Sequence, residues 1–280
     1  MEPYFKTNKG VLYKNDAWKV LEEIEPKSVD LVILDPPYVK TRDVRIKSNE
    51  WSLNKNWSTL FKQINEILKD NGVVFLFGFP SYYLKIAEYI TKYFRVYFDM
   101  IWVKKAPIGF INCKRRPLQQ HEQIVCLIKY NAKVTKITYN YKAIARKGKP
   151  YKKTRKNKYC PYANIMYKDI INEGIGYPTT VVVAPNKPTM KKEERTPHPT
   201  QKPLELIEYL VKGWTNENNV VLDPFCGSGT TAVACEKLNR RWICIEIEER
   251  WCNLTKERVL KVAKQSSIKE FLANCNTISL

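Results

Sequence analysis

Residues 29–38 read Val29-Asp30-Leu31-Val32-Ile33-Leu34-Asp35-Pro36-Pro37-Tyr38, an apolar run that ends in a rigid polar turn. Such a run predicts a buried parallel strand, whose carboxyl end opens onto a crevice. Asp35 offers a carboxylate there, the two prolines hold φ at about −65° and remove two donors, and Tyr38 adds a ring face. Residues 35–38 therefore suit a planar amine such as the NH2 of adenine or cytosine, although a stiff turn that simply ends a strand looks the same.

A second motif occupies residues 220–232, Val220-Val221-Leu222-Asp223-Pro224-Phe225-Cys226-Gly227-Ser228-Gly229-Thr230-Thr231-Ala232. It predicts a strand, a glycine turn and the start of a helix, because glycine lets the backbone turn sharply and approach a ligand closely. The helix is expected to run through residue 238, and a second strand over residues 242–245. That strand ends at Glu246, where a nucleoside-binding βαβ unit holds a ribose diol.

The glycine pattern at 227–232 also opens the dinucleotide fold of NAD-dependent dehydrogenases, which is the competing enzyme class. Only about fifty residues follow Gly229, too few for a dinucleotide domain, so the sheet must use strands from earlier in the chain. If residues 220–222 and 29–34 are neighbours in one parallel sheet, both motifs open onto the same crevice.

The residues between these motifs predict further helices and strands. Apolar positions at helical spacing indicate a helix over 57–68, ended by Asn71-Gly72, and residues 73–77 indicate a buried strand. A helix over 81–93 and strands over 96–103 and 123–128 are expected to follow. Residues 39–54 have no lasting period, which indicates a loop beside the 35–38 turn.

The charge of the chain points to a polyanionic partner. Lys and Arg number 48 against 28 Asp and Glu, a net charge of +20, and residues 123–168 hold thirteen basic and no acidic residues. Tyrosines alternate with these cations, a mixture that can neutralise phosphates and stack on bases. We interpret this region as a target-recognition insert, with a solvated basic loop lacking sequence preference as the alternative. The candidate nucleic-acid contacts are Lys114, Arg115, Arg116, Arg146, Lys147, Lys149, Lys152, Lys153, Arg155 and Lys156.

Cysteine and histidine usage disfavours a metal site. The eight cysteines include no Cys-x-x-Cys pair and there are only two histidines, so we expect no zinc and no other metal. Free thiols suit a reducing interior. The amino terminus has no apolar secretory stretch, and no run approaches the roughly 18 apolar residues of a membrane helix, so we expect a cytoplasmic protein without membrane contact.

With both motifs in hand, the chain resembles the DNA amino-methyltransferases, which move a methyl group from S-adenosylmethionine to adenine N6 or cytosine N4. The resemblance extends from residue 11 to about residue 259. The catalytic tetrapeptide precedes the cofactor loop, which is the permuted order of the β group of that family. Further matches are Arg116 with His121-Glu122, residues 177–181, and His198-Pro199-Thr200-Gln201-Lys202-Pro203-Leu204.

The resemblance implies a role for each matching residue. Asp35 and the carbonyl of Pro36 would accept from the target amine, and Tyr38 would stack on the extruded base, with Pro37 between them in the catalytic tetrapeptide. The implied cofactor site consists of Asp16, Lys202, Pro203, Asp223, Phe225, Gly227, Ser228, Gly229, Thr230 and Glu246. In that set Asp16 would meet the adenine of the cofactor, Lys202 and Pro203 would close over its methionine end, and Glu246 would hold its ribose. Cys244 departs from the glycine usual in relatives.

The expected fold is therefore α/β and Rossmann-like, a mostly parallel twisted sheet with helices on both faces. We expect a catalytic half at 1–128, the basic insert at 129–195, a cofactor half at 196–264 and an extension at 265–280. The expected activity is methylation of adenine N6 in double-stranded DNA by base flipping, because relatives with Asp in the first motif position more often act on adenine. Cytosine N4 is the alternative, and a nonenzymatic DNA-binding module is another. The sequence does not decide between a monomer and a homodimer, or whether a cognate restriction endonuclease exists.

Overall fold

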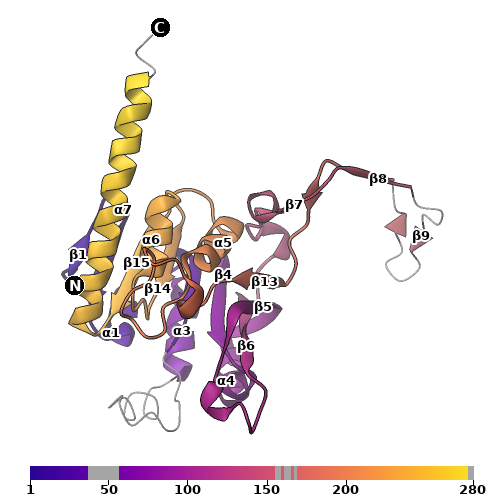
Figure 1. Ribbon diagram of the computed structural model, residues 1–280. Coiled ribbons are helices and arrows are strands. Elements are labelled where there is room, and N and C mark those ends of the chain that lie inside the picture. The colour runs from indigo at the N-terminus through magenta and orange to yellow at the C-terminus, as the bar shows by residue number, and fades with distance from the viewer. Residues whose placement is uncertain (37–56, 155–158, 161–164, 167–168, 277–280) are drawn as a thin grey trace. The chain divides into compact units, whose positions relative to one another are not determined.

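The computed structural model describes residues 1–36, 57–154, 159–160, 165–166 and 169–276 (Figure 1). The chain forms two units, a large one from residues 1–139 and 180–280 and a small one from residues 140–179. The predictions for Pro37, Tyr38, Arg155, Lys156 and the 39–54 loop lie outside the described residues. None of the helices in the described ranges is long and apolar enough to cross a membrane.

A mixed nine-stranded sheet forms the centre of the large unit, in the order β1-β2-β15-β14-β3-β4-β6-β5-β13. The five strands from β2 to β4 in this order are parallel, and β6 runs antiparallel to both of its neighbours. The strands are β1 (Phe5–Lys6), β2 (Gly10–Lys14), β3 (Val29–Leu34), β4 (Leu68–Gly78), β5 (Phe94–Ile108), β6 (Gln119–Lys129), β13 (Val181–Ala184), β14 (Val220–Asp223) and β15 (Arg241–Glu246).

Helices pack on both faces of this sheet, because its central strands are apolar on both sides. Alternate side chains of β4 divide between the faces: Val74 and Leu76 belong to the core with α1, α3 and α4, whereas the Phe75 ring contacts Trp214 at the end of α5. The helices are α1 (Ala17–Leu21), α3 (Trp57–Ile67), α4 (Pro80–Tyr93), α5 (Leu204–Trp214), α6 (Thr230–Lys237) and α7 (Glu249–Asn276), with 3-10 turns η1 (Phe110–Asn112), η2 (Val134–Lys136) and η4 (Lys187–Thr189).

The register of the sheet brings the two sequence motifs together. β14 pairs with β3 in parallel, with Val221 opposite Leu31 and Leu222 opposite Val32. Asp35 follows the last residue of β3, and the glycine loop follows Asp223 at the end of β14. The predicted neighbourhood of these strands is confirmed, and both motifs lie at the carboxyl edge of the sheet.

One predicted helix end is wrong. Asn71-Gly72 does not stop α3, because the chain enters β4 at Leu68 and residues 69–72 form an irregularity opposite β3, between the pairs Val29–Leu68 and Leu31–Val73. A Cβ at Gly72 would lie 2.7 Å from Leu68 Cδ1 and 3.0 Å from the Asp30 carbonyl oxygen. This glycine therefore allows two backbones to approach closely.

The small unit is shorter at both ends than the predicted 129–195 insert. β6 continues to Lys129, and β13 extends the large sheet by pairing in parallel with β5, so residues 129–139 and 180–195 belong to the large unit. The small unit contains η3 (Tyr141–Ile144) and three antiparallel two-stranded ladders. They are β7 (Arg146–Lys147) with β12 (Ile175–Gly176), β8 (Tyr151–Lys153) with β11 (Ile170–Asn172), and β9 (Tyr159–Cys160) with β10 (Ile165–Met166).

Candidate active site

The Asp35 carboxylate lies at the carboxyl end of β3 in a chain of alternating charges. Lys202 Nζ is 2.5 Å from Asp35 Oδ2 and 3.3 Å from Glu122 Oε1. Glu122 Oε2 lies in turn 3.0 Å from Lys104 Nζ. We call Asp35, Lys202, Glu122 and Lys104 the charge network. Asp35 directly follows β3, Lys202 precedes α5, and Glu122 and Lys104 lie in β6 and β5, so only the folded sheet assembles the network.

The charge network is largely withdrawn from water. The Glu122 and Lys104 side chains are each 6% exposed, against 12% for Lys202 and 19% for Asp35. Burial opposes the charge on Glu122, but Lys202 and Lys104 hold its pKa below the ordinary value. Burial likewise opposes the charge on Lys202, but Asp35 and Glu122 hold its pKa above the ordinary value. Both shifts favour the charged form of the group concerned, so the Glu122 carboxylate and the Lys202 ammonium stabilise each other inside the network.

Aromatic rings support the two lysines of the network. The ammonium of Lys202 lies 5.0 Å from the Phe77 ring centroid, and that of Lys104 lies 5.0 Å from the Trp102 ring centroid. Cations are attracted to the faces of such rings, most strongly where water is excluded. The rings thus restrict the positions of both ammonium groups, and Lys202 in turn restricts the Asp35 carboxylate that it contacts.

The second part of the site is the glycine loop with Glu246. The Glu246 carboxylate, at the end of β15, accepts from Gly227 N at 3.0 Å and from Glu248 N at 2.8 Å. Burial raises its pKa above the ordinary value. Because a carboxylate has about four lone-pair positions, Glu246 keeps acceptor capacity for a hydroxyl group.

Glycine is required at position 229 by both conformation and space. Its φ is +72°, and a Cβ there would lie 2.4 Å from Thr255 Cγ2. Thr255 donates to the Gly227 carbonyl at 3.2 Å, so α7 packs directly against the loop. Ser228 is buried, and Thr230 Oγ1 donates to the Lys202 carbonyl at 3.2 Å. The loop therefore contacts the segment that supplies the network lysine.

Two acidic residues predicted to bind the cofactor also organise the local backbone. Asp223 is buried and accepts from Phe225 N at 3.1 Å and from Thr231 Oγ1 at 2.5 Å. Burial raises the pKa of Asp223 to about 7. Asp16 is the N-cap of α1 and accepts from Trp18 N at 3.0 Å, and the Trp18 ring contacts Phe225 edge-on at 5.8 Å. Pro203 is the N-cap of α5, directly after Lys202.

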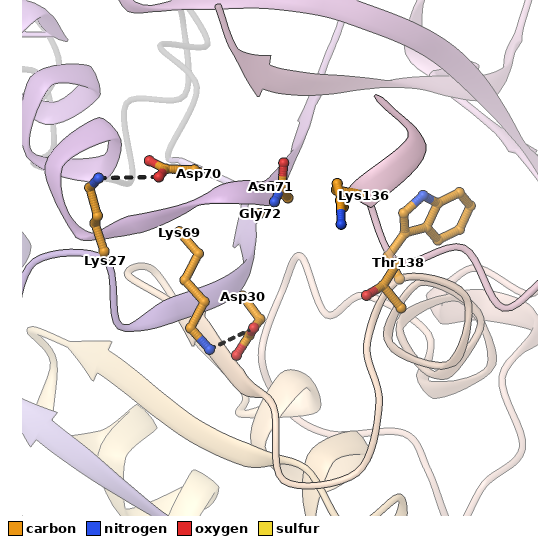
Figure 2. A pocket seen from close by; sticks show the side chains of 9 residues that line it. Lys27, Asp30, Lys69, Asp70, Asn71, Gly72, Lys136 and Thr138 are labelled. Atoms are coloured by element: carbon orange, nitrogen blue, oxygen red, sulfur yellow. Dashed lines mark hydrogen bonds and ion pairs between the residues drawn. The ribbon is translucent and has the colours of Figure 1, made fainter. Parts of the chain in front are cut away.

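The pocket shown in Figure 2 lies at the opposite edge of the sheet. Lys27 and Asp30 stand at the beginning of β3, and residues 69–72 at the beginning of β4. The volume is about 370 Å³, and ion pairs cross it from Lys69 to Asp30 at 2.7 Å and from Lys27 to Asp70 at 3.1 Å. It therefore has no part in chemistry at Asp35.

The structure separates the candidate nucleic-acid contacts into two groups. Lys114, Arg115 and Arg116 lie in the exposed connection between β5 and β6 of the large unit. The small unit holds the other candidates that the structure describes, which are all exposed: Arg146, Lys147, Lys149, Lys152 and Lys153. Glu122 and Lys104 have no role in the sequence analysis, since a single charged residue within a strand-forming run does not reveal its partners. The one signal that pointed to them was the position of Glu122 beside His121 in a family match.

Comparison with known proteins finds relatives along most of this chain. A protein-family profile described as DNA methylase, of the N6 and N4 type, matches residues 29–257. The chain is 26% identical over 278 residues to a protein named Type II methyltransferase M2.DpnII of Streptococcus pneumoniae, covering 92% of each. It is 29% identical over 248 residues to one named Type II methyltransferase M.HpaI of Haemophilus parainfluenzae, covering 88% of this chain and 72% of the relative.

Solved structures agree with these sequence relatives. The crystal structure of the M1.HpyAVI-SAM complex matches with a TM-score of 0.57 and 26% identity, covering 88% of this chain and 98% of that one. The PvuII DNA methyltransferase, described as cytosine-N4-specific, matches with a TM-score of 0.65 and 16% identity, covering 94% of each chain. The second likeness concerns the fold alone.

Proposed function

The chain belongs to the DNA methylase family of S-adenosylmethionine-dependent N6-adenine and N4-cytosine methyltransferases. From that premise we propose that it methylates N6 of adenine in DNA, with Asp35 as the residue that contacts the target amine. The observation that carries this proposal is that β3 and β14 are neighbouring strands. Asp35 follows β3, and the glycine loop, which donates from Gly227 N to Glu246, follows β14. Asp at position 35, the choice more usual among adenine-specific relatives, supports adenine over cytosine.

The residues of the cofactor loop fit S-adenosylmethionine by their chemistry. Glu246 can accept from ribose hydroxyls while holding Gly227 N, and Asp16 lies near it, because β2 and β15 are parallel neighbours and Asn15 N donates to the Glu246 carbonyl at 3.1 Å. Phe225 offers a ring edge beside them. The cofactor, when bound, supplies an electrophilic sulfonium methyl group.

Asp35 acts on the nitrogen that receives the methyl group. An exocyclic amine is a poor nucleophile because its lone pair is delocalised into the ring, and base pairing occupies it in a duplex. Extrusion of the base costs a few kcal/mol, which stacking on Tyr38 would offset. The Asp35 carboxylate and the Pro36 carbonyl would then accept the two amine hydrogens, turn the lone pair toward the methyl group, and stabilise the positive charge that develops on nitrogen. Lys202 holds one carboxylate oxygen in place during this step.

One assay tests both the reaction and the choice of base. The full chain is incubated with labelled S-adenosylmethionine and plasmid DNA, and the DNA is digested to nucleosides and read by modification-aware sequencing. N6-methyladenine in a fixed sequence context is the expected product, and the reads identify that context. N4-methylcytosine would overturn the assignment of the base, and unmodified DNA would overturn the activity itself.

Replacing Glu246 with alanine should weaken cofactor binding before it affects chemistry. The variant loses the acceptor proposed for the ribose diol. We expect the Kd for S-adenosylmethionine to rise by about 10- to 100-fold, because one or two hydrogen bonds to a charged group are lost. Calorimetric titration measures the Kd. Glu249→Ala is a matched control, because Glu249 is 61% exposed and pairs with Lys14 at the surface. An unchanged Kd in Glu246→Ala would contradict the proposed role.

We propose that the small unit binds the DNA backbone. Tyr151 and Tyr177 are exposed, and both line a hollow of about 410 Å³ together with the cations Arg146 and Lys149. Cations that neutralise phosphates release counterions, so binding should weaken steeply with salt. Phosphate contacts position a protein without reading sequence, so the recognition sequence does not follow from them.

Replacing Lys147, Lys149, Lys152 and Lys153 together with alanine should make the salt slope shallower. We expect the slope of log K against log salt to fall by roughly 0.9 for each phosphate that is no longer neutralised, up to about 3.6 in total. Fluorescence anisotropy with a labelled duplex at several salt concentrations measures it. The control replaces Lys6, Lys9 and Lys14 of the β1–β2 region, and this change should alter the slope less. Equal slopes for wild type and the small-unit variant would remove this role.

The partners follow from the family in outline. DNA is the substrate, and methyltransferases of this type belong to restriction-modification systems. We propose further that the protein acts in the cell interior, where DNA is found, that a cognate restriction endonuclease shares its target, and that the chain assembles as a homodimer. Sedimentation of the purified chain tests the last of these.

A further inference from the structure

The connection between β5 and β6 carries an exposed apolar tip within a basic loop. Ile111 is 99% exposed and Phe110 63% exposed. Lys105 near the end of β5, and Lys114, Arg115 and Arg116 in the connection, are all exposed, and none of these four pairs with an acidic group among the described residues. No Asp or Glu occurs anywhere from Lys105 to Gln120. We call residues 105–118 the basic hairpin tip.

The tip has a defined conformation and a fixed base. Gly109 (φ +92°) leads into η1, and the backbone amides of Asn112 and Cys113 donate to the carbonyls of Gly109 and Phe110. At the base, the buried Asn186 side chain donates to the Ala106 carbonyl at 2.9 Å and accepts from Ala106 N at 3.2 Å. Phe110 and Ile111 are therefore presented to solvent on an ordered turn.

The hairpin projects from the edge of the sheet that carries Asp35. β6 is antiparallel to β4, and its pairing places Gln123 opposite Gly78 at the carboxyl end of β4. The chain before Gln123 continues past that end, and Figure 1 shows this hairpin extending beyond the body of the sheet. The rung at its base pairs Trp102 with Glu122, a member of the charge network. Glu122 contacts Lys202, and Lys202 contacts Asp35, so the strand that leads from the tip also carries a member of the network around Asp35.

We propose that Phe110 and Ile111 form a wedge that enters the DNA duplex beside the target base and stabilises the extruded state. The inference rests on the proposed base-flipping function and extends it to a second contact surface. Apolar side chains inserted between base steps unstack them, and flanking cations hold the phosphates on either side. The basic surroundings favour a polyanion over an apolar protein surface as the occupant. A wedge of this kind lowers the free-energy cost of base extrusion, which stacking on Tyr38 and contacts at Asp35 would otherwise have to offset alone.

The test compares paired and mismatched substrates, once the target sequence is known from the sequencing assay. For Phe110→Ala/Ile111→Ala, we expect kcat/KM on a fully paired duplex to fall by about 10- to 100-fold, because extrusion costs a few kcal/mol. On a duplex with a mismatch at the partner of the target base, where extrusion is easier, the variant should come within about 3-fold of wild type. Fluorescence of 2-aminopurine at the target position should rise on binding wild type and rise less with the variant.

The control is Val96→Ala, because Val96 is an apolar residue 56% exposed on the same strand β5 but toward the opposite edge of the sheet. For this variant, kcat/KM should stay at the wild-type value on the paired and on the mismatched duplex. Equal losses on paired and mismatched duplexes, or no loss on either, would overturn the wedge. A change in sedimentation of the variant would overturn it in favour of a contact between two copies of the chain. A wild type that methylates neither duplex would instead contradict the proposed function.

Discussion

Replacing Asp35 with alanine is expected to reduce kcat by about 10²- to 10³-fold while S-adenosylmethionine still binds. Asp35 is proposed to stabilise charge that develops on the amine only in the transition state, and removal of one such preorganised group has an effect of this size. The glycine loop, proposed to bind the cofactor, is held by hydrogen bonds of Glu246, Asp223 and Thr255 to residues of the loop and of α6, and these bonds do not involve Asp35. Single-turnover methylation measures the chemical step, and calorimetry measures the cofactor Kd.

The matched control for this experiment is Asp35→Asn. It keeps the volume and an oxygen acceptor but removes the charge opposite Lys202, 2.5 Å away. We expect a kcat between those of the wild type and the alanine variant, because a neutral oxygen accepts more weakly than a carboxylate. Near-normal turnover in Asp35→Ala would refute the catalytic assignment. Loss of cofactor binding in both variants would place Asp35 in the cofactor site instead.

Replacing Glu122 with alanine is expected to lower the free energy of unfolding by roughly 3–5 kcal/mol. Glu122 is the counterion of Lys104, which is 6% exposed, and it also neutralises part of the charge of Lys202. Removing one partner of a buried ion pair leaves an uncompensated charge in a poorly solvated site, which accounts for the size of the effect. Urea denaturation at neutral pH measures the free energy, and the slope with denaturant shows whether the transition stays two-state.

Glu208→Ala is a matched control within the same chain. Glu208 also bridges two lysines, with Lys237 at 2.6 Å and Lys212 at 3.3 Å, but these lysines are 42% and 37% exposed. Solvated pairs contribute little, so this change should cost less than about 1 kcal/mol. Pairing Glu122→Leu with Lys104→Met should recover most of the lost stability, because it removes both buried charges. Equal losses for Glu122→Ala and Glu208→Ala would show that burial of the network has no energetic consequence.

Local patterns were sufficient to predict most of the central strands. The apolar runs ending at Asp35 and Asp223, and the run before Glu246, are the strands β3, β14 and β15 within one or two residues. A buried parallel strand needs a continuous apolar run, so composition alone reveals it. The Asn71-Gly72 prediction failed for a reason that lies outside the segment. The glycine there lies against Leu68 of its own strand and against the Asp30 carbonyl of β3, and the second contact exists only after β3 and β4 pair.

The sequence by itself therefore determined the α/β class, the strand-end carboxylates Asp35 and Glu246, the glycine loop and the basic character of the middle region. These properties depend on neighbouring residues, which local propensity and hydrophobic pattern encode. Only the tertiary structure decided that Lys202 pairs with Asp35, that Glu122 and Lys104 complete a buried network, and that Phe110 and Ile111 face solvent beyond the sheet edge that carries Asp35. The partners in that network are separated by up to 167 positions, and an ion pair between distant residues depends on strand order and register, which no local pattern records.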